Sequence, residues 1–123
     1  MPRLLIKRAY DPPAPEDGIR FLVDRYWPRG MRKDELQAES WLRDISPSAA
    51  LIKWFGHQAE LWEEFVQRYY AELDEHRAAL EPIRAALQHS DVTLLYSAHD
   101  TEHNNAVALR AYLQGEHSGD AAP

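Results

Sequence analysis

The spacing of apolar residues predicts three short strands. Residues 4–8 and 19–23 form two largely apolar runs, and the weak alternation of the second is typical of a strand buried on both faces. The clearest strand pattern is Val92-Thr93-Leu94-Leu95-Tyr96. Prolines in residues 11–15 exclude regular structure between the first two strands. This connection is short for a parallel crossover, so the pattern alone leaves open either a parallel pair or a long hairpin.

Helical periodicity fills much of the chain between residues 36 and 114. A helix is predicted to begin at Ser46-Pro47, with the serine as its cap, and to end at Gly56. The next helix begins near residue 59 and has apolar residues at every fourth position: Leu61, Phe65, Tyr69 and Leu73. Further helices are expected at 76–88 and 102–114, and Pro82 predicts a kink or a late start in the first of them. Segment 36–45 is expected to be at least partly helical, with one apolar face formed by Leu36, Trp41, Leu42 and Ile45.

This order of elements predicts one α/β domain with a small sheet of about three or more strands packed with several helices. The domain is expected to span residues 1–114. Residues 115–123 are small and polar, and they are expected to form a flexible tail.

Composition narrows the classes of function. The chain has 123 residues and a formal net charge of −6, which argues against a broad nucleic-acid-binding surface. It has no cysteine, so disulfides, zinc ribbons and thiol catalysis are excluded. No segment is apolar for long enough to cross a membrane or to form a signal-peptide core, so we expect no membrane partner and a cytoplasmic location.

The first candidate site follows the second strand, in the octet Val23-Asp24-Arg25-Tyr26-Trp27-Pro28-Arg29-Gly30. Arg25 and Arg29 offer planar donor groups suited to a carboxylate or a phosphate. Trp27 could stack on a ring, and Asp24 could orient an arginine or act as a base. Alternatively, the aspartate and the arginines satisfy one another and nearby carbonyls, while the tryptophan belongs to the core.

The second candidate site lies between the last strand and the last helix, where ligands bind in open α/β sheets. His103 could donate or accept a proton, because histidine titrates near neutral pH, with Asp100 and Asn104 beside it. Alternatively, Asp100 or Thr101 caps the helix and the histidines face solvent. His99 and His103 lack a clear third ligand, so we assign no metal, and no cofactor is identified.

The third candidate is His57, which follows Gly56 in a tight connection between two helices. It could act as an acid or a base in a cleft, or it could cap the next helix. The common glycine-rich nucleotide-binding motifs and the nucleophile elbow of hydrolases are absent from the sequence.

A family resemblance rests on six segments that occur in order along the chain. They are Tyr10-Asp11-Pro12-Pro13, the octet 23–30, Lys53-Trp54-Phe55-Gly56-His57, Arg68-Tyr69 with Glu72-Leu73, Thr93-Leu94-Leu95-Tyr96 and Glu102-His103-Asn104. Together they resemble the YeaO-like branch of the DUF488 family of proteins of unknown function, from about residue 5 to residue 113. The resemblance implies a bacterial or archaeal cytoplasmic α/β domain with a parallel sheet, and it supplies no function.

The chain departs from the family pattern at two positions. Members often carry Arg or Lys where His99 stands, which fits anion binding better than metal binding. Members often carry His where Asn105 stands, so a second histidine beside His103 is missing here.

If the strands are parallel, these segments meet at one edge of the sheet. We therefore expect a small cytoplasmic enzyme that acts on an anionic, phosphorylated or nucleotide-like small molecule. The expected catalytic residues are His103, His57 and Asp24, and the expected substrate-binding residues are Arg25, Arg29, Trp27, Asp100 and Asn104. The alternative is a non-catalytic module that binds a ligand or a protein and in which the Asp/Arg cluster is structural. The sequence leaves the oligomeric state open.

Overall fold

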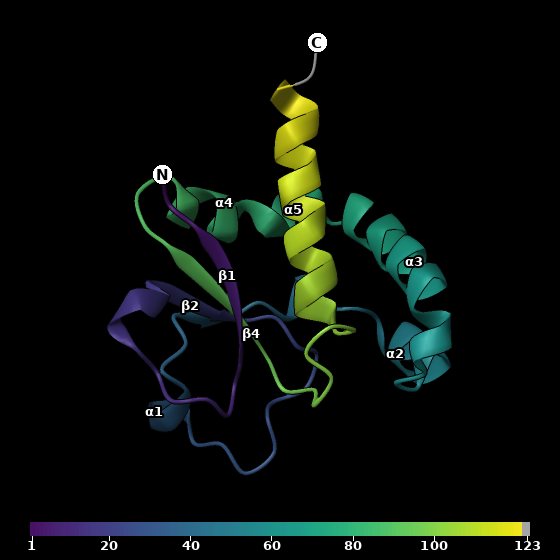
Figure 1. The fold of residues 1–123 in the computed structure, drawn as a ribbon, viewed down its shortest axis with the longest axis horizontal. Helices are drawn as coiled ribbons and strands as arrows, with labels where there is room; N and C mark the ends of the chain where they lie inside the picture. Colours follow the sequence, from purple (N-terminus) through teal and green to yellow (C-terminus); the bar gives the residue numbers. More distant parts are fainter. Residues whose placement is uncertain (122–123) are drawn as a thin grey trace.

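A parallel sheet of four strands forms the centre of the computed structural model (Figure 1). The structure describes the backbone of residues 1–121 and the side chains of residues 1–115. The strands lie in the order β1-β4-β2-β3, and every neighbouring pair is parallel. Their bounds are Leu4–Arg8 for β1, Ile19–Leu22 for β2, Ser40–Trp41 for β3 and Val92–Tyr96 for β4. The predicted α/β class and parallel sheet are confirmed, and the hairpin alternative is wrong because β4 lies between β1 and β2.

The register aligns the carboxyl ends of the three longer strands. Arg8 at the end of β1 is paired with Tyr96 at the end of β4, and Leu22 at the end of β2 is paired with Leu95. The segments that follow these strands therefore leave the sheet at the same edge. In open α/β sheets, ligands bind at the edge formed by the carboxyl ends of the strands.

Segment 36–45 does not form the predicted helix. The short helix α1 (Lys33–Leu36) ends where Gln37 takes a left-handed conformation with φ 53°. The chain then forms β3, and a 3-10 turn (Arg43–Ile45) follows. Trp41 therefore lies on an edge strand, where its ring packs against the ring of Trp27. The expectation that it lines a helical face is wrong.

Helix α2 (Ala49–Phe55) begins later than predicted. The hydroxyl of Ser48, two residues beyond Ser46, accepts a hydrogen bond from the Leu51 amide and caps the helix. Ser46 instead has an extended backbone, and its hydroxyl donates to the Arg43 carbonyl. The predicted end at Gly56 is confirmed, because this residue is left-handed with φ 54°.

Three longer helical elements complete the fold. Helix α3 (Trp62–Asp74) follows a 3-10 turn at Ala59–Leu61, and helix α4 (Glu81–Leu87) follows one at Arg77–Leu80. Pro82 lies in the first turn of α4, which confirms the late start. Helix α5 spans Asn105–Ala121. It continues beyond residue 114, and the predicted division between a domain and a flexible tail remains a prediction because residues 122–123 lie outside the described part.

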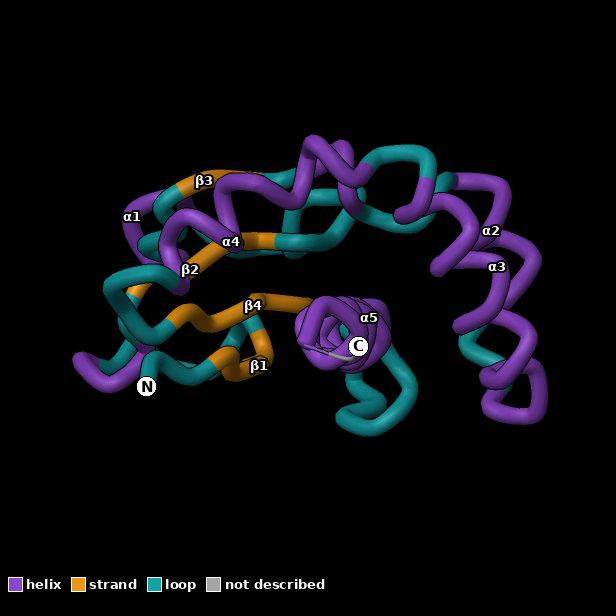
Figure 2. The backbone as a smooth tube through the Cα atoms, turned by 90° about the horizontal axis from the view of Figure 1, so that it is seen from above, coloured by secondary structure: helices purple, strands orange, loops and turns teal. Residues whose placement is uncertain are grey.

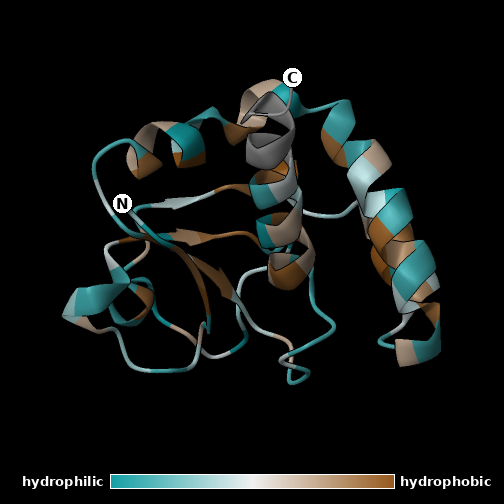
Figure 3. Ribbon diagram, turned by 45° about the horizontal axis from the view of Figure 1, so that its top comes forward, coloured by the Kyte–Doolittle hydropathy of each residue, from teal (hydrophilic) through white to brown (hydrophobic). Residues whose placement is uncertain are grey.

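Apolar residues cover both faces of the sheet. Leu94 of β4 joins a large core with Tyr69 and Leu109, and the neighbouring Leu95 joins a small second cluster with Leu22 and Leu36. Helix α5 packs on β1 and β4, and the pair α2 and α3 stands on the far side of α5 (Figure 2). Figure 3 shows the apolar strands at the centre of the fold, with polar residues on the outer faces of the helices.

A buried ionic cluster fixes the connection between β1 and β2. The guanidinium of Arg20 donates to the Asp17 carboxylate over 2.6 Å and to the Leu36 carbonyl over 2.6 Å and 3.2 Å. The ammonium of Lys7 lies 3.2 Å from both oxygens of the same carboxylate. The Thr93 hydroxyl donates to the Asp17 carbonyl. The proline-rich loop is thereby attached to three strands.

Candidate functional site

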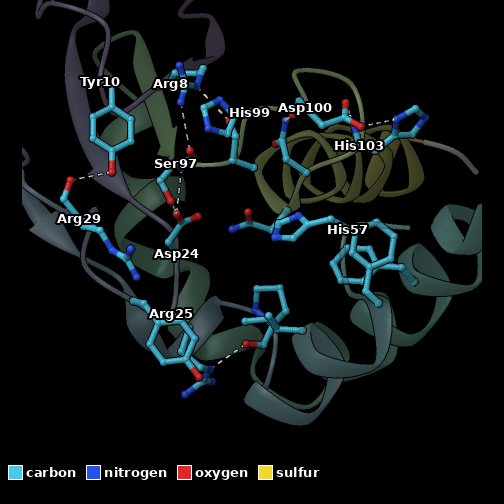
Figure 4. Close-up of a pocket in the computed structure, with 18 of the residues that line it drawn as sticks. Arg8, Tyr10, Asp24, Arg25, Arg29, His57, Ser97, His99, Asp100 and His103 are labelled. Atoms are coloured by element: carbon cyan, nitrogen blue, oxygen red, sulfur yellow. Dashed lines mark hydrogen bonds and ion pairs between the residues drawn. The ribbon is translucent and has the colours of Figure 1, made fainter. Parts of the chain in front are cut away.

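A cleft of about 950 Å³ lies at the carboxyl edge of the sheet (Figure 4). The segments after β1, β2 and β4 form one side, and α2, α3 and the start of α5 complete it. Its lining includes all eight residues predicted from the sequence: Asp24, Arg25, Trp27, Arg29, His57, Asp100, His103 and Asn104. The structure therefore brings the three candidate segments together, and the roles assigned to these residues remain predictions.

Asp24 follows β2 and is held by the segment that follows β4. Its Oδ2 accepts hydrogen bonds from the Ser97 amide over 2.9 Å and from the Ser97 hydroxyl over 2.7 Å. Burial raises the pKa of the Asp24 carboxyl, although hydrogen bonds from Ser97 and Asn105 oppose the shift. This carboxyl therefore keeps its proton to a higher pH than an exposed aspartate.

Two of the cleft's arginines are anchored by backbone carbonyls. Arg8 donates through Nε to the Ala98 carbonyl over 3.0 Å and through Nη2 to the Ser97 carbonyl over 3.3 Å. Arg25 donates through Nε to the Pro47 carbonyl over 2.8 Å. Both side chains are half-buried, so each guanidinium is held in place at the wall of the cleft.

Arg29 differs from the other two because it is exposed. Its carbonyl accepts a hydrogen bond from the Tyr10 hydroxyl over 2.9 Å, which ties the octet to the loop after β1. The guanidinium of Arg8 lies over the ring of Tyr10, 5.3 Å from its centre. The two loops and their arginines are thereby linked.

Within the described part of the chain, the three arginines have no acidic partner. Among the residues whose side chains are described, Arg8, Arg25 and Arg29 form no salt bridge. Asp24 is bound by Ser97 rather than by its sequence neighbour Arg25. The alternative in which the aspartate and the arginines pair with one another is therefore not observed. Its other part, in which arginines donate to nearby carbonyls, is observed for Arg25.

Asp100, His103 and Asn104 organise the turn that leads into α5. The Asp100 carboxylate accepts the amides of Glu102 and His103, and its Oδ2 lies 3.0 Å from Nδ1 of His103. These hydrogen bonds lower the pKa of the Asp100 carboxyl. Asn104 is buried, and its side-chain oxygen accepts the amide of Val107 and so caps the helix.

The remaining candidates, His57 and Trp27, carry rings and also line the cleft. His57 is exposed and has a left-handed backbone with φ 58°, an uncommon conformation for a residue other than glycine. Trp27 is half-buried, and its indole nitrogen donates to the Met31 carbonyl. Tyr26 beside it is 59% exposed, so it offers a free aromatic face to the cleft.

Sequence reasoning missed several lining residues. Arg8, Tyr10 and Ser97 line the cleft, as does Asn105, which was considered only as a departure from the family. Arg8 ends β1 and Ser97 directly follows β4, so the rule that places ligands at strand ends would have identified both. No sequence signal identifies Asn105, whose amide donates to the Val23 carbonyl.

The cleft combines guanidinium groups with carboxyl groups and aromatic rings. The described residues contain no group of three or more His, Cys, Asp or Glu side chains placed to bind a metal ion. His103 is already paired with Asp100. What the cleft does offer is guanidinium donors and aromatic faces, which suit carboxylate or phosphate groups and planar rings.

The fold and the site define a small α/β domain with a cleft at the carboxyl edge of a parallel sheet. The chain belongs to the DUF488 family as a YeaO-like member, and residues 3–122 match the model described as the inactive DUF488-N3 subclade. It is 39% identical over 108 residues to the uncharacterized protein YeaO of Escherichia coli, which covers 88% of this chain and 94% of the relative. Uncharacterized proteins of Mycobacterium tuberculosis and Mycobacterium bovis are each 38% identical over 113 residues, 92% of this chain and 95% of theirs. No solved structure matches the chain.

Of the helices in the described part of the chain, none combines the length and apolar character needed to span a membrane.

Proposed function

We propose that the chain is a ligand-binding domain whose cleft takes up an anionic small molecule. The observation that carries this proposal is the set of three cleft arginines, Arg8, Arg25 and Arg29, without a salt bridge among the described residues. A guanidinium that has no acidic partner retains donors for a carboxylate or a phosphate.

The acidic residues of the cleft support the same proposal. Asp24 and Asp100 both line it, yet their oxygens accept hydrogen bonds from Ser97 and from the turn before α5. The exposed ring of Tyr26 favours a ligand that carries a planar group, such as a phosphorylated or nucleotide-like molecule.

We favour binding without turnover over catalysis because of the family model that the chain matches. The geometry itself is compatible with proton transfer, since Asp24, His57 and His103 all line the cleft and His103 is paired with Asp100. The family model describes an inactive subclade, which favours a domain that binds a ligand and releases it unchanged. A cytoplasmic location remains part of the proposal, and fractionation of cells that express the tagged chain tests it.

The test is isothermal titration of the protein with inorganic phosphate, pyrophosphate and adenosine monophosphate at physiological salt. We expect saturable binding of at least one probe. The double variant Arg25→Gln/Arg29→Gln should bind at least about tenfold more weakly, because each hydrogen bond to a charged group contributes about 1.5–3 kcal/mol. Thermal melts of each variant report whether it is folded.

The matched control is Arg32→Gln/Arg68→Gln. It makes the same change in net charge on two exposed arginines that do not line the cleft. Equal weakening by the two double variants would indicate only a general charge effect and would contradict a specific site. The absence of saturable binding by the wild-type protein to every anion tested would contradict the proposal itself.

The second candidate function is acid–base catalysis by Asp24. The raised pKa of the Asp24 carboxyl and its position in the lining of the cleft favour this alternative. Phosphate release from phosphate monoesters and nucleotides should then be measurable, and Asp24→Asn should abolish it. A binding domain instead predicts no release, and an equal or higher anion affinity in Asp24→Asn because a negative charge is removed.

A further inference from the structure

The arginines of the cleft stand at separate places around it. In the close-up, Arg8 lies at one end of the cleft wall and Arg25 at the other, with Asp24 between them (Figure 4). They come from different elements, since Arg8 ends β1 and Arg25 belongs to the octet after β2. Because the Asp24 carboxyl lies between them in this view, we treat the two guanidiniums as two separate places for an anionic group.

Each of these two guanidiniums keeps donors for a ligand. The hydrogen bonds of Arg25 to the protein use Nε alone, so both terminal nitrogens remain available in the described structure. Arg8 uses Nε and Nη2, and its Nη1 remains available. Because both side chains are half-buried and anchored on carbonyls, binding an anion costs them little side-chain entropy.

Arg25 also borders a second pocket of about 330 Å³, which is lined by the acidic residues Asp44, Glu72 and Glu75. The Glu72 carboxylate accepts the Ser48 amide over 2.8 Å and the Ser48 hydroxyl over 2.6 Å. Among the described side chains, none of these three carboxylates forms an ion pair with Arg25.

From this arrangement we propose that the ligand of the cleft carries two separate anionic groups, one bound by Arg8 and the other by Arg25, joined by an uncharged segment that passes Asp24. The inference rests on the proposed function and specifies its ligand class as a small dianion, either a dicarboxylate or a bisphosphate. A cleft of about 950 Å³ is large enough to hold a small dianion of this kind.

The experiment compares dianions with monoanions of matched length by isothermal titration. Dicarboxylates from succinate to suberate are paired with the corresponding monocarboxylates, and alkane bisphosphonates are paired with alkane monophosphonates. At the best length, the dianion should bind at least about tenfold more tightly than its partner, because it gains a second charged contact. The two probe series distinguish carboxylate from phosphate recognition.

Single variants locate the two contacts. Arg8→Gln and Arg25→Gln should each reduce the affinity for the dianion to about that for the monoanion, while Arg68→Gln, outside the cleft, should leave the difference unchanged. Arg8→Lys and Arg25→Lys keep the charge and should restore part of the gain. If a glutamine variant fails to fold, the lysine variants and the length series measured on the wild-type protein still test whether the ligand binds through two anionic groups.

The outcomes separate this inference from the proposed function. If monoanions and dianions bind equally well at every length, the inference is overturned and anion binding stands. A gain for dianions that survives both glutamine variants also overturns it. If no anion of either series binds, both proposals fail.

Discussion

Replacing Asp17 by asparagine should strongly destabilise the fold. Asn keeps the size of the side chain and removes the carboxylate charge that pairs with both Arg20 and Lys7. The Arg20 side chain is 5% exposed and would then bury its charge with neutral acceptors, such as the Leu36 carbonyl, in place of an ionised partner. Removing one partner of a buried ion pair costs about 3–5 kcal/mol.

A loss of this size is large compared with the total free energy of unfolding. A domain of this length has a free energy of unfolding of about 6–18 kcal/mol at 0.05–0.15 kcal/mol per residue. The midpoint of thermal unfolding should fall by about 12–20 °C, at about 4 °C for each kcal/mol. Urea denaturation at neutral pH, followed by circular dichroism, measures the free energy directly.

The effect should depend on pH in a defined direction. Burial alone would raise the pKa of the Asp17 carboxyl, but hydrogen bonds from Ala14, Lys7 and Arg20 outweigh it, so the pKa is lowered. The contribution of Asp17 is therefore fully present above its unfolded pKa of about 3.9 and is lost as the pH falls through the lower folded pKa. The wild-type protein and Asp17→Asn should converge in stability at strongly acidic pH.

The control is Glu64→Gln, which breaks an exposed pair with Arg68 on α3. It should cost less than about 1 kcal/mol, as exposed pairs do. A loss below about 1 kcal/mol for Asp17→Asn, no larger than that of the control, would refute the reasoning that the buried cluster braces the loop.

Three further changes test the fold and the site. Gly18→Ala should cost more than about 2 kcal/mol, because φ is 65° and a Cβ would lie 2.1 Å from the Asp91 carbonyl oxygen. Gly30→Ala, with φ 77° and no atom within 4 Å, should cost only the left-handed penalty of about 1–2 kcal/mol, and equal losses in urea denaturation would contradict the close approach at Gly18. Asn104→Ala should lower the free energy of unfolding by about 0.5–2 kcal/mol through loss of the α5 cap, and an unchanged unfolding midpoint would contradict that role. The Asp24 carboxyl should titrate above the ordinary aspartate value of about 3.9 in carbon-detected NMR, so its contribution to stability falls as the pH rises through the folded pKa; a midpoint at or below 3.9 would contradict the burial argument.

Local patterns were sufficient to predict the three longer strands and the position of the cleft. The runs at β1 and β4 are short, apolar and bounded by polar residues, so their limits follow from the sequence. Once the sheet is parallel, the segments after its strands must meet at one edge. That constraint placed the octet and the segment around His103 in one cleft.

Long-range partners could not be predicted in this way. Arg8 is anchored on the carbonyls of Ser97 and Ala98, which are 89 and 90 positions away. Asp24 and Arg25 are neighbours in sequence, yet one is bound by Ser97 and the other by Pro47. Neighbouring charges in a sequence therefore gave no indication of which groups pair.

The edge strand β3 and the start of helix α2 could not be predicted from the sequence either. Two residues make β3, and its pairing with β2 depends on the left-handed turn at Gln37 rather than on any apolar period. The cap at Ser48 similarly depends on its tertiary contact with Glu72, since the Ser46-Pro47 pair is the better local signal.

An NMR titration of isotopically labelled protein with pyrophosphate at physiological salt tests the central claim most directly. The account predicts saturable shifts of the amides around Arg25, Ser97 and His103, and of the side-chain signals of at least one of the cleft arginines, with little change at Arg68 on α3. It also predicts that Arg25→Gln weakens these shifts. Shifts spread evenly over the surface, or no saturable shift within the cleft for pyrophosphate or for the dicarboxylates, would contradict an anion-binding cleft.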